Sequence, residues 1–403
     1  MLGIALVAGI VLVGCGGQAD NAGNAYSADH LAPSMKRTPL AMVDSNRISV
    51  GCDDVLALRI DGSVFFWGID TTGMRGVAAP LLADTPHLVP VLHNIVSVKA
   101  GCGHGVALGG DGTVWTWGAN DSGQLGNGTF TSSVMPAPVA GIAGVKAISA
   151  GYDHTIALRS DGTVWCWGSC NLGPSGAMLT VPTMVPNINN VAQVAAQEFT
   201  VMSKTDGTVW AWGTEGFPGD GTTGWALYPV QALGLNDAKS LGAGAYSSNY
   251  LVLQGDGTVW GWGCNRSGDL GVASPPSFAY PIRLGGLSDV KAVSTQFENS
   301  AAVTFGGAVY VWGGNAEGQL GIGTLAVAST TVPTKLLDPG DAVAVAAGYD
   351  FTVVLNRDGS VYGAGKNSGG QLANNSLYQT ISPTQVVGIG GVGFLNLGVS
   401  TAP

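Results

Sequence analysis

The sequence of 403 residues has little charge, because Asp, Glu, Lys and Arg make up only 10% of it, against roughly 25% in an average soluble domain. Its apolar share is an ordinary 46%, so the chain lacks the weakly apolar, highly charged composition of disordered proteins. The 16 basic residues are outnumbered by 26 acidic ones. The resulting formal charge of −10 argues against a nucleic-acid partner.

Motifs for catalysis and cofactor binding are also missing. The sequence contains no Gly-x-Ser-x-Gly nucleophile elbow with ordered partners and no phosphate-binding Gly-Lys-Ser/Thr loop. The 64 glycines do not recur at every third position, which excludes collagen. We therefore predict no catalytic residues, no cofactor and no metal. The high glycine content instead favours many short strands joined by tight turns.

The only long apolar run lies at the start of the chain, from Met1 to Val13. It is too short to cross a bilayer as a helix, which takes about 20 residues, but it suits the core of an export signal. The run ends in Leu12-Val13-Gly14-Cys15, which resembles a bacterial lipobox, and the resemblance implies cleavage before Cys15 and attachment of lipid to it. We predict a lipoprotein signal peptide at residues 1–15, a flexible tether at 16–41, and an exported protein held at the outer membrane or cell surface by this lipid alone. The alternative is a buried N-terminal strand with a core cysteine.

A unit recurs seven times, with steps of 50 residues between Asp61, Asp111 and Asp161. Asp-Gly marks six copies, and a Trp-Gly pair follows it six residues later. The Asp-Gly pairs are Asp61-Gly62, Asp111-Gly112, Asp161-Gly162, Asp206-Gly207, Asp256-Gly257 and Asp358-Gly359, with Gly306-Gly307 in the sixth slot. The tryptophans are Trp67, Trp117, Trp167, Trp212, Trp262 and Trp312, and we align Tyr362-Gly363-Ala364-Gly365 with them as the degraded seventh copy. Seven markers in the same order predict a repeat architecture.

Each copy is expected to form about four strands. In the second copy, Gly105–Leu108 is a short apolar run, Asp111-Gly112 supplies two residues that tolerate positive φ in a hairpin turn, and Thr113–Trp117 alternates. Extended segments follow Pro136 and cover Val145–Ser149. Four-stranded sheets at this period close radially, so we predict an all-β fold, a seven-bladed β-propeller over residues 42–403. The blades fall near 42–90, 91–140, 141–186, 187–232, 233–284, 285–336 and 337–398; an open β-solenoid is the alternative.

The unit resembles the regulator of chromosome condensation repeat. In the second copy the resemblance lies in Asp111-Gly-Thr-Val-Trp115, Trp117-Gly-Ala-Asn120 and Ser122-Gly-Gln-Leu-Gly126. It covers roughly residues 42–398 and implies a seven-bladed propeller. Copies three and four lack the Gly-Gln-Leu-Gly element, so we expect altered loops there. Because Arg47–Gly51 and Phe394–Gly398 match the same strand, either end of the chain can supply the strand that closes the ring.

Two histidines, His104 and His154, share one column of the repeat. In the related repeats this histidine is a structural consensus residue, and no third ligand stands at metal-binding spacing, so we interpret both as structural. The neighbouring column is acidic in five of seven copies, and we call these five residues the acidic rim: Asp53, Asp153, Glu198, Glu298 and Asp350.

One strand separates the acidic rim from the Asp-Gly turns, so the rim and the turns are expected at opposite ends of the blades. The returning strand then brings the Trp-Gly-x-Asn loops to the same end as the rim. Two interpretations of the rim remain open. It attracts cations or a basic partner, or its carboxylates only cap turns on a solvated face.

Trp225 departs from the repeat, because the other tryptophans belong to the blade motif. With Tyr228 it lies in a divergent stretch of the fourth copy. We interpret this pair as a candidate binding anchor, since Trp and Tyr are enriched at binding hot spots; partial burial is the alternative.

The cysteines allow two disulfides in an exported protein. Cys52 and Cys102 share one column of adjacent blades, and Cys166 and Cys170 straddle the bend at Trp167. Free buried thiols are equally compatible with the sequence.

These observations favour a surface-anchored, monomeric, non-catalytic propeller that binds an unknown protein or cell-surface partner through one rim of loops. By resemblance, exported bacterial members of the repeat family include a seven-bladed inhibitor that grips its target enzyme with one face. The alternatives are guanine-nucleotide exchange on a small GTPase, which the family's nuclear prototype performs, and a carbohydrate-binding or enzymatic propeller. The exchange prototype inserts a wedge between strands, and the short steps between copies leave no room for one.

Overall fold

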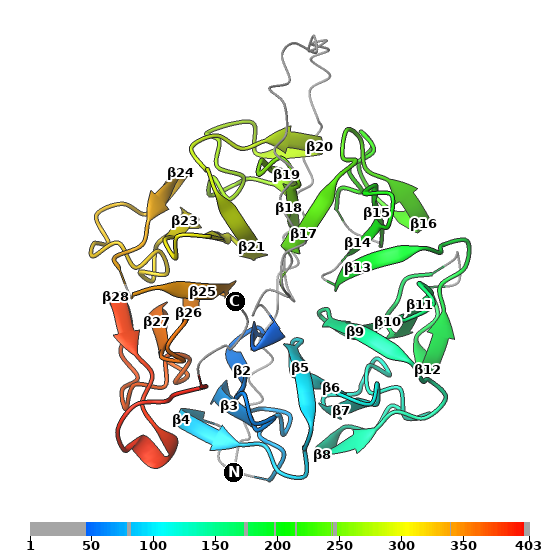
Figure 1. Ribbon diagram of the computed structural model, residues 1–403, viewed down its shortest axis with the longest axis horizontal. Coiled ribbons are helices and arrows are strands. Elements are labelled where there is room, and N and C mark those ends of the chain that lie inside the picture. The colour runs from blue at the N-terminus through cyan, green and yellow to red at the C-terminus, as the bar shows by residue number, and fades with distance from the viewer. Residues whose placement is uncertain are drawn as a thin grey trace, which may run out of the picture.

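The computed structural model describes residues 46–78, 82–172, 176–196, 199–213, 216–242, 244, 248–338 and 340–398. Their strands form seven four-stranded antiparallel sheets, arranged around a central axis as the blades of a propeller (Figure 1). The prediction of an all-β, seven-bladed propeller is confirmed. The signal peptide, Cys15 and the tether lie outside the described residues, as does Glu198 of the acidic rim.

Within every blade the strands follow chain order from the centre outward. The inner strands are β1 (Ile48–Val50), β5 (Ile95–Ala100), β9 (Val145–Ala150), β13 (Val191–Ala196), β17 (Ala238–Gly242), β21 (Val290–Gln296) and β25 (Ala342–Ala347). The second strands are β2 (Asp54–Leu58), β6 (His104–Gly109), β10 (His154–Arg159), β14 (Thr200–Lys204), β18 (Asn249–Gln254), β22 (Asn299–Thr304) and β26 (Phe351–Asn356).

The third strands carry the tryptophan motif, and the outer strands form the exposed edges of the blades. The third strands are β3 (Val64–Ile69), β7 (Val114–Gly118), β11 (Val164–Gly168), β15 (Val209–Gly213), β19 (Val259–Cys264), β23 (Val309–Gly314) and β27 (Val361–Gly365). The outer strands are β4 (Leu82–Leu88), β8 (Ser133–Pro138), β12 (Leu179–Met184), β16 (Ala226–Gln231), β20 (Ser277–Arg283), β24 (Ser329–Lys335) and β28 (Thr380–Gln385). A 3₁₀ helix, η2 (Ile389–Gly391), follows the last strand. Among the described residues, no helix has the length and apolar character needed to span a membrane.

The Asp-Gly turns join the second and third strands, but only their glycines have positive φ. Gly112 has φ 83°, whereas Asp111 does not lie in the left-handed region. The Gly112 N–H donates to the Gly109 carbonyl and the Gly109 N–H donates to the Thr113 carbonyl, as in a type I turn followed by a left-handed glycine. The prediction that both residues of the pair use positive φ is therefore wrong. Asp111 contributes its carboxylate, which accepts the Thr113 N–H at 2.9 Å.

The motif tryptophans are fully buried and join neighbouring blades. In five blades the indole N–H donates to a backbone carbonyl in the loop of the preceding blade, as Trp117 does to Met74 at 2.6 Å. In the seventh blade Ala364 lies opposite Thr352, where the second blade pairs Trp117 with Gly105. Ala364 thus takes the buried tryptophan position, and Tyr362 takes the place of Trp115 two residues earlier, so the degraded seventh copy has alanine instead of the buried tryptophan.

The two ends of the described chain meet between the seventh and first blades, where the red end of the chain lies beside the blue first blade (Figure 1). The N-terminal segment supplies the inner strand β1, so the C-terminal segment takes a different place. The Leu397 N–H donates to the Gly359 carbonyl of the seventh blade, and its own carbonyl accepts the Ile60 N–H of the first blade at 2.9 Å. The Arg47 guanidinium donates to the carbonyls of Leu397 and Gly398. We call residues 394–398 the C-terminal clasp.

Candidate binding face

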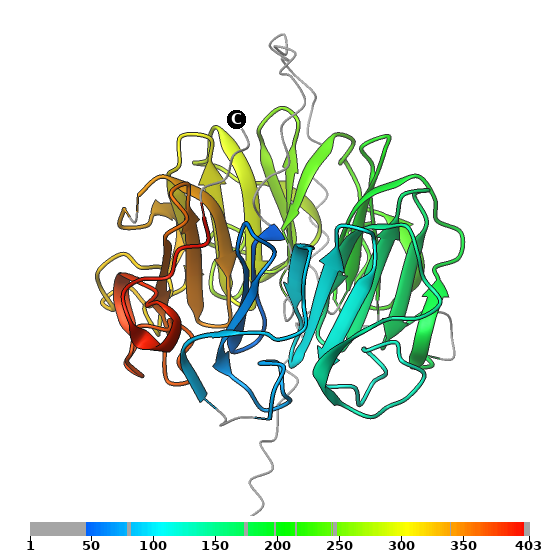
Figure 2. The same cartoon turned by 60° about the horizontal axis from the view of Figure 1, so that its bottom comes forward.

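The strands run between two faces of the ring, as the turned view shows (Figure 2). At one face the inner strands end, the second strands begin, and the loops leave the third strands; we call it the acidic face. The opposite face carries the Asp-Gly turns, and we call it the turn face. The predicted separation of the acidic rim from the turns follows from this topology.

The described members of the acidic rim are held by the preceding blade. Each carboxylate accepts a hydrogen bond from a side chain of the loop after the third strand of that blade. The pairs are Lys366 and Gln371 with Asp53 (both 2.9 Å), Ser122 with Asp153 (3.2 Å), Ser267 with Glu298 (2.6 Å) and Gln319 with Asp350 (3.1 Å). The rim residues therefore join blades, a role that neither sequence interpretation included. Asp53 and Asp153 still expose about a third of their side chains.

Burial and mutual repulsion raise the pKa values of the acidic face. Burial raises the pKa of Asp350 to about 6, assisted by the charges of Glu317, Glu298 and Asp53 and opposed by Lys366. Burial raises the pKa of Asp269 to about 7 and also raises that of Asp153. Carboxyls gathered in this way indicate a negative potential that favours an approaching cation.

The turn face balances its charges locally. Hydrogen bonds from the neighbouring Thr or Ser lower the pKa values of Asp111, Asp161, Asp206 and Asp358. Ion pairs on this face are Arg59–Asp61, Arg159–Asp161, Lys239–Asp237 and Arg357–Asp341. The excess negative charge of the described ring therefore lies on the acidic face.

Large apolar side chains project from the loops that leave the third strands at the acidic face. They come from five blades and are exposed: Val77 (42%), Phe130 (52%), Trp225 (71%), Leu325 (43%) and Tyr378 (83%). Tyr228, at 48% exposed, lies three residues beyond Trp225 in β16. The exposure of this pair is consistent with a binding anchor and differs from the partial burial that was the alternative for Trp225.

An asparagine fixes several of these loops from within. Asn120 Oδ1 accepts the Leu125 N–H, and its Nδ2 donates to the carbonyls of Thr129 and Thr131. Asn265, Asn315 and Asn367 make the corresponding bonds in the fifth, sixth and seventh blades. A buried amide with all these partners holds Phe130 and Tyr378 on ordered loops, which lowers the entropy lost when a partner binds.

Aromatic rings stand where the inner strands end. Phe297 and Tyr349, from neighbouring blades, stack with ring centroids 4.1 Å apart, and the Lys366 ammonium lies 5.4 Å from the centroid of Tyr349. Burial and the charges of Asp350, Asp53 and Glu298 raise the pKa of Tyr349. The middle of the acidic face thus combines carboxylates with aromatic rings.

The structure contains both disulfides that the sequence allowed. Cys52–Cys102 joins the first and second blades beside the acidic rim, and Cys166–Cys170 lies within the third blade. The Cα atoms are 5.0 Å and 6.0 Å apart.

His104 and His154 lie buried between blades. Their Nε2 atoms are 3.2 Å and 3.1 Å from the hydroxyls of Thr155 and Thr200 in the following blades. Burial lowers the pKa of His104 to about 3 and that of His154 to about 4. Neutral, buried imidazoles paired with threonine have a packing role, and the described residues contain no cluster of three metal-ligating side chains.

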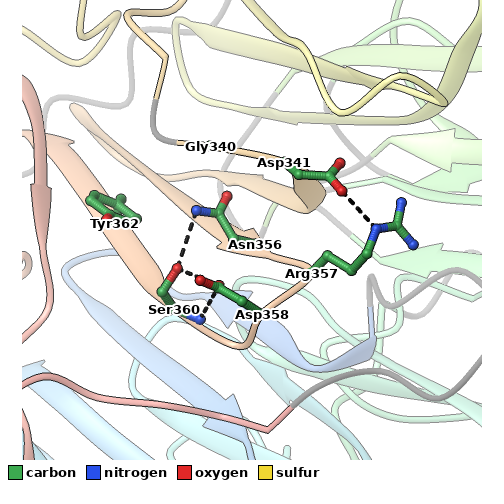
Figure 3. A pocket seen from close by; sticks show the side chains of 7 residues that line it. All are labelled: Gly340, Asp341, Asn356, Arg357, Asp358, Ser360 and Tyr362. Carbon is green, nitrogen blue, oxygen red and sulfur yellow. Dashed lines mark hydrogen bonds and ion pairs between the residues drawn. The ribbon is translucent and has the colours of Figure 1, made fainter.

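A shallow cavity of about 440 Å³ lies on the turn face of the seventh blade (Figure 3). Arg357 pairs with Asp341 on one side, while Ser360 donates to Asp358 on the other, with Tyr362 across the hollow. Hydrogen bonds from Ser360 lower the pKa of Asp358, so this carboxylate is not suited to transfer a proton near neutral pH.

Comparison with known proteins agrees with this architecture. A family model described as the regulator of chromosome condensation (RCC1) repeat matches residues 111–158, 256–296 and 306–355, and a second model of that description matches 95–124, 145–172 and 342–371. The chain contains RCC1 repeats. The repeat explains why the same Asp-Gly, Trp-Gly and Gln-Leu elements occupy equivalent places in successive blades.

Three solved structures share the fold. Prp20p from Saccharomyces cerevisiae, described with its binding to Gsp1p and histones, is 23% identical at a TM-score of 0.73, over 82% of this chain and 87% of that one. Yeast RCC1 (Prp20) bound to Kap60 is 22% identical at a TM-score of 0.71, over 90% and 91%. Human WBSCR16 is 21% identical at 0.70, over 82% and 95%. At these identities the likeness shows the fold.

Several residues of the acidic face were not predicted from the sequence. Lys366 and the stacked pair Phe297–Tyr349 became visible only through contacts between blades. Phe130 and Tyr378 gave a usable signal, because each is a large aromatic residue in a loop between the third and outer strands. Trp225 was found by that same reasoning.

Proposed function

We propose that this protein is a non-catalytic scaffold that binds another protein through its acidic face, and that the partner presents a basic surface. The observation that supports it best is the coincidence, on one face, of partly exposed carboxylates around the axis and exposed apolar side chains on the surrounding loops. Charged centres that steer a partner and aromatic anchors that hold it are the two usual components of a protein interface. On the turn face, four carboxylates pair with Arg or Lys, so this face offers less attraction for a basic partner than the acidic face does.

The similar propellers add support at the level of the fold. The yeast propeller Prp20 is described with its binding to Gsp1p and histones and bound to Kap60. A rigid ring with a loop set in every blade suits recognition. The pairing of both buried histidines with threonine hydroxyls favours a binding role over catalysis.

Photo-crosslinking tests which face binds. A photoreactive phenylalanine analogue replaces Phe130 or Tyr378 in the full chain, and a third variant carries it at Ile389, which is exposed on the segment after β28. We expect the same protein to crosslink at positions 130 and 378 but not at 389, with a yield that falls as salt rises. Crosslinking only at 389 would place binding elsewhere.

Charge variants then test the mechanism with the captured partner. Asp153→Asn with Glu298→Gln removes two rim charges but keeps acceptors for Ser122 and Ser267. We expect Kd to rise about tenfold, mainly through a slower association rate at low salt. Asp338→Asn, an exposed carboxyl on the turn face, is the matched control. Equal association rates for both variants would refute the role of the rim.

We also propose that a lipid on Cys15 anchors the chain at the bacterial cell envelope. The support is the Leu12-Val13-Gly14-Cys15 motif after an apolar run. The test is metabolic labelling with an alkynyl fatty acid in a bacterial host. The full chain should be labelled and sediment with membranes, whereas Cys15→Ser should not be labelled. Label retained by the variant would exclude this cysteine.

A further inference from the structure

At one equivalent position of the inner strands, a single blade has a residue that differs in size and charge from those of the other six. The pairing with the second strands makes Ser49, Lys99, Ser149, Ala195, Gly242, Ser294 and Ala346 equivalent. Six of these residues are small, as expected where seven strands converge on an axis. The second blade instead places the long, cationic side chain of Lys99 there.

Lys99 lines a cavity in the central channel. The cavity measures about 120 Å³ and is bounded by the inner strands of the blades, which surround the centre of Figure 1. Its described lining residues are apolar or small apart from Lys99 and four serines, Ser49, Ser149, Ser240 and Ser294. None of these lining residues is acidic, so the Lys99 ammonium has no carboxylate beside it in the described wall.

Three of these serines accept a backbone hydrogen bond and keep a hydroxyl hydrogen to donate. Ser49, Ser149 and Ser294 each accept a backbone N–H from the next blade, from Ala100, Ala196 and Ala347, at 2.9–3.0 Å. An oxygen occupied in this way still has its hydroxyl hydrogen to donate, and none of the three donates to a described residue. Several O–H groups and one ammonium therefore line a small cavity whose described side chains include no carboxylate.

Lys99 is partly exposed, and drawing an ammonium even partly out of water without a counterion is costly, so such charges are normally paired. Burial lowers the pKa of Lys99 to about 8, which leaves it mostly protonated at neutral pH. Packing between blades does not require a lysine at this position. In three blades a serine there accepts a backbone N–H from the next blade. The charge is therefore best explained by a ligand of opposite charge.

We propose that the central channel binds a small tetrahedral oxyanion, phosphate or sulfate, held by the Lys99 ammonium and the hydroxyls of Ser49, Ser149 and Ser294. A cavity of this volume holds about four waters at about 30 Å³ each, so one such anion fits with its remaining hydration. Lys99 lies one residue before the end of β5, so this site is in the channel near the acidic face, but none of its described lining residues is a rim carboxylate. The proposed anion site therefore does not depend on the proposed protein partner.

The test uses the full chain and its Lys99→Ser variant, which restores the residue that three other blades have. Thermal unfolding at pH 7 compares sodium phosphate, sodium sulfate and sodium chloride at equal ionic strength. We expect an oxyanion at ten times its Kd to raise the wild-type Tm by about 2 °C, and the shift to vanish in Lys99→Ser. The relative size of the phosphate and sulfate shifts identifies which oxyanion binds more tightly.

Two controls separate this site from general ion effects. Lys146→Ser removes an exposed lysine from the next inner strand, β9, and should keep the full shift. Raising the pH to 9.5 should weaken binding to the wild type, because Lys99 then loses its proton. Phosphorus NMR line broadening of inorganic phosphate gives a direct measure of binding. The proposal is overturned if chloride reproduces the shift, or if Lys99→Ser retains it.

Discussion

At the scale of single residues, adjoining blades are joined by polar side chains buried at fixed places. Thr155 donates to the Gln124 carbonyl at 2.9 Å, so its oxygen accepts from His104 Nε2, and the proton of the neutral imidazole lies on that nitrogen. In the sixth blade an asparagine makes the corresponding contact, because Asn299 Nδ2 donates to the Thr352 hydroxyl at 2.9 Å. In these blades the column places a side-chain donor against a threonine of the next blade, and either histidine or asparagine supplies it, whereas the seventh blade has Phe351 at this position.

This equivalence predicts the effect of His104→Asn. The folded state keeps His104 neutral down to about pH 3, whereas the unfolded chain binds a proton below about 6.5, so protonation favours unfolding as pH falls between these values. Relative to the variant, the wild type should lose about 2 kcal/mol between pH 7.5 and pH 5, at about 1.4 kcal/mol per pH unit. Urea unfolding of both proteins measures it. His93→Asn, at an exposed site, should leave the pH profile unchanged; parallel profiles for wild type and His104→Asn would contradict the assignment.

At the scale of the element, hairpin turns at equivalent positions of the repeat differ in the residues that surround them. Gly207 and Gly257 occupy the same turn position with φ 84° and 83°. A methyl group at Gly257 meets no atom within 4 Å, but at Gly207 it would strike the carbonyl oxygen of Asn236 in the connection to the next blade. Identical turns thus have different surroundings.

The pair Gly257→Ala and Gly207→Ala separates backbone strain from steric clash. Both substitutions place alanine in the left-handed region, which costs about 1–2 kcal/mol. Gly207→Ala should cost at least about 1 kcal/mol more, because the connection at Asn236 must shift. Chemical denaturation of the two variants side by side measures the difference. Equal losses would mean that the connection moves freely and that φ alone decides the cost.

Element by element, the periodic features were predictable and the contacts between blades were not. The Asp-Gly and Trp-Gly markers were enough for strand count and blade count, because each marker is a local requirement of a turn or a packed third strand. The pairing of Asp53 with Lys366 joins residues 313 positions apart. No local pattern contains that information. The acidic column itself was predictable, but its bonds to the preceding blade were not.

At the scale of the whole molecule, the ring separates two kinds of surface and closes by a segment that adds no strand. The acidic face combines carboxylates with exposed aromatic loops, while the turn face pairs its charges. Closure uses β1 from one end and the C-terminal clasp from the other. Leu395 and Leu397 of the clasp are buried with residues of the first and seventh blades, including Ile48 and Val386.

Truncation tests the clasp. Ending the chain after Val392 removes two buried leucines, each worth about 1.5–3 kcal/mol of burial, and the carbonyls that Arg47 and Ile60 use. We expect a loss of at least about 3 kcal/mol in unfolding free energy, with amide exchange rising first in β1 and β2 because the first blade loses its link to the seventh. Ending the chain after Gly398 keeps the clasp and should leave both measurements near the full-length values. If the two truncations behave alike, or if exchange rises uniformly around the ring, the clasp does not close the propeller and the packing of β1 against β25 and β5 holds the seam by itself.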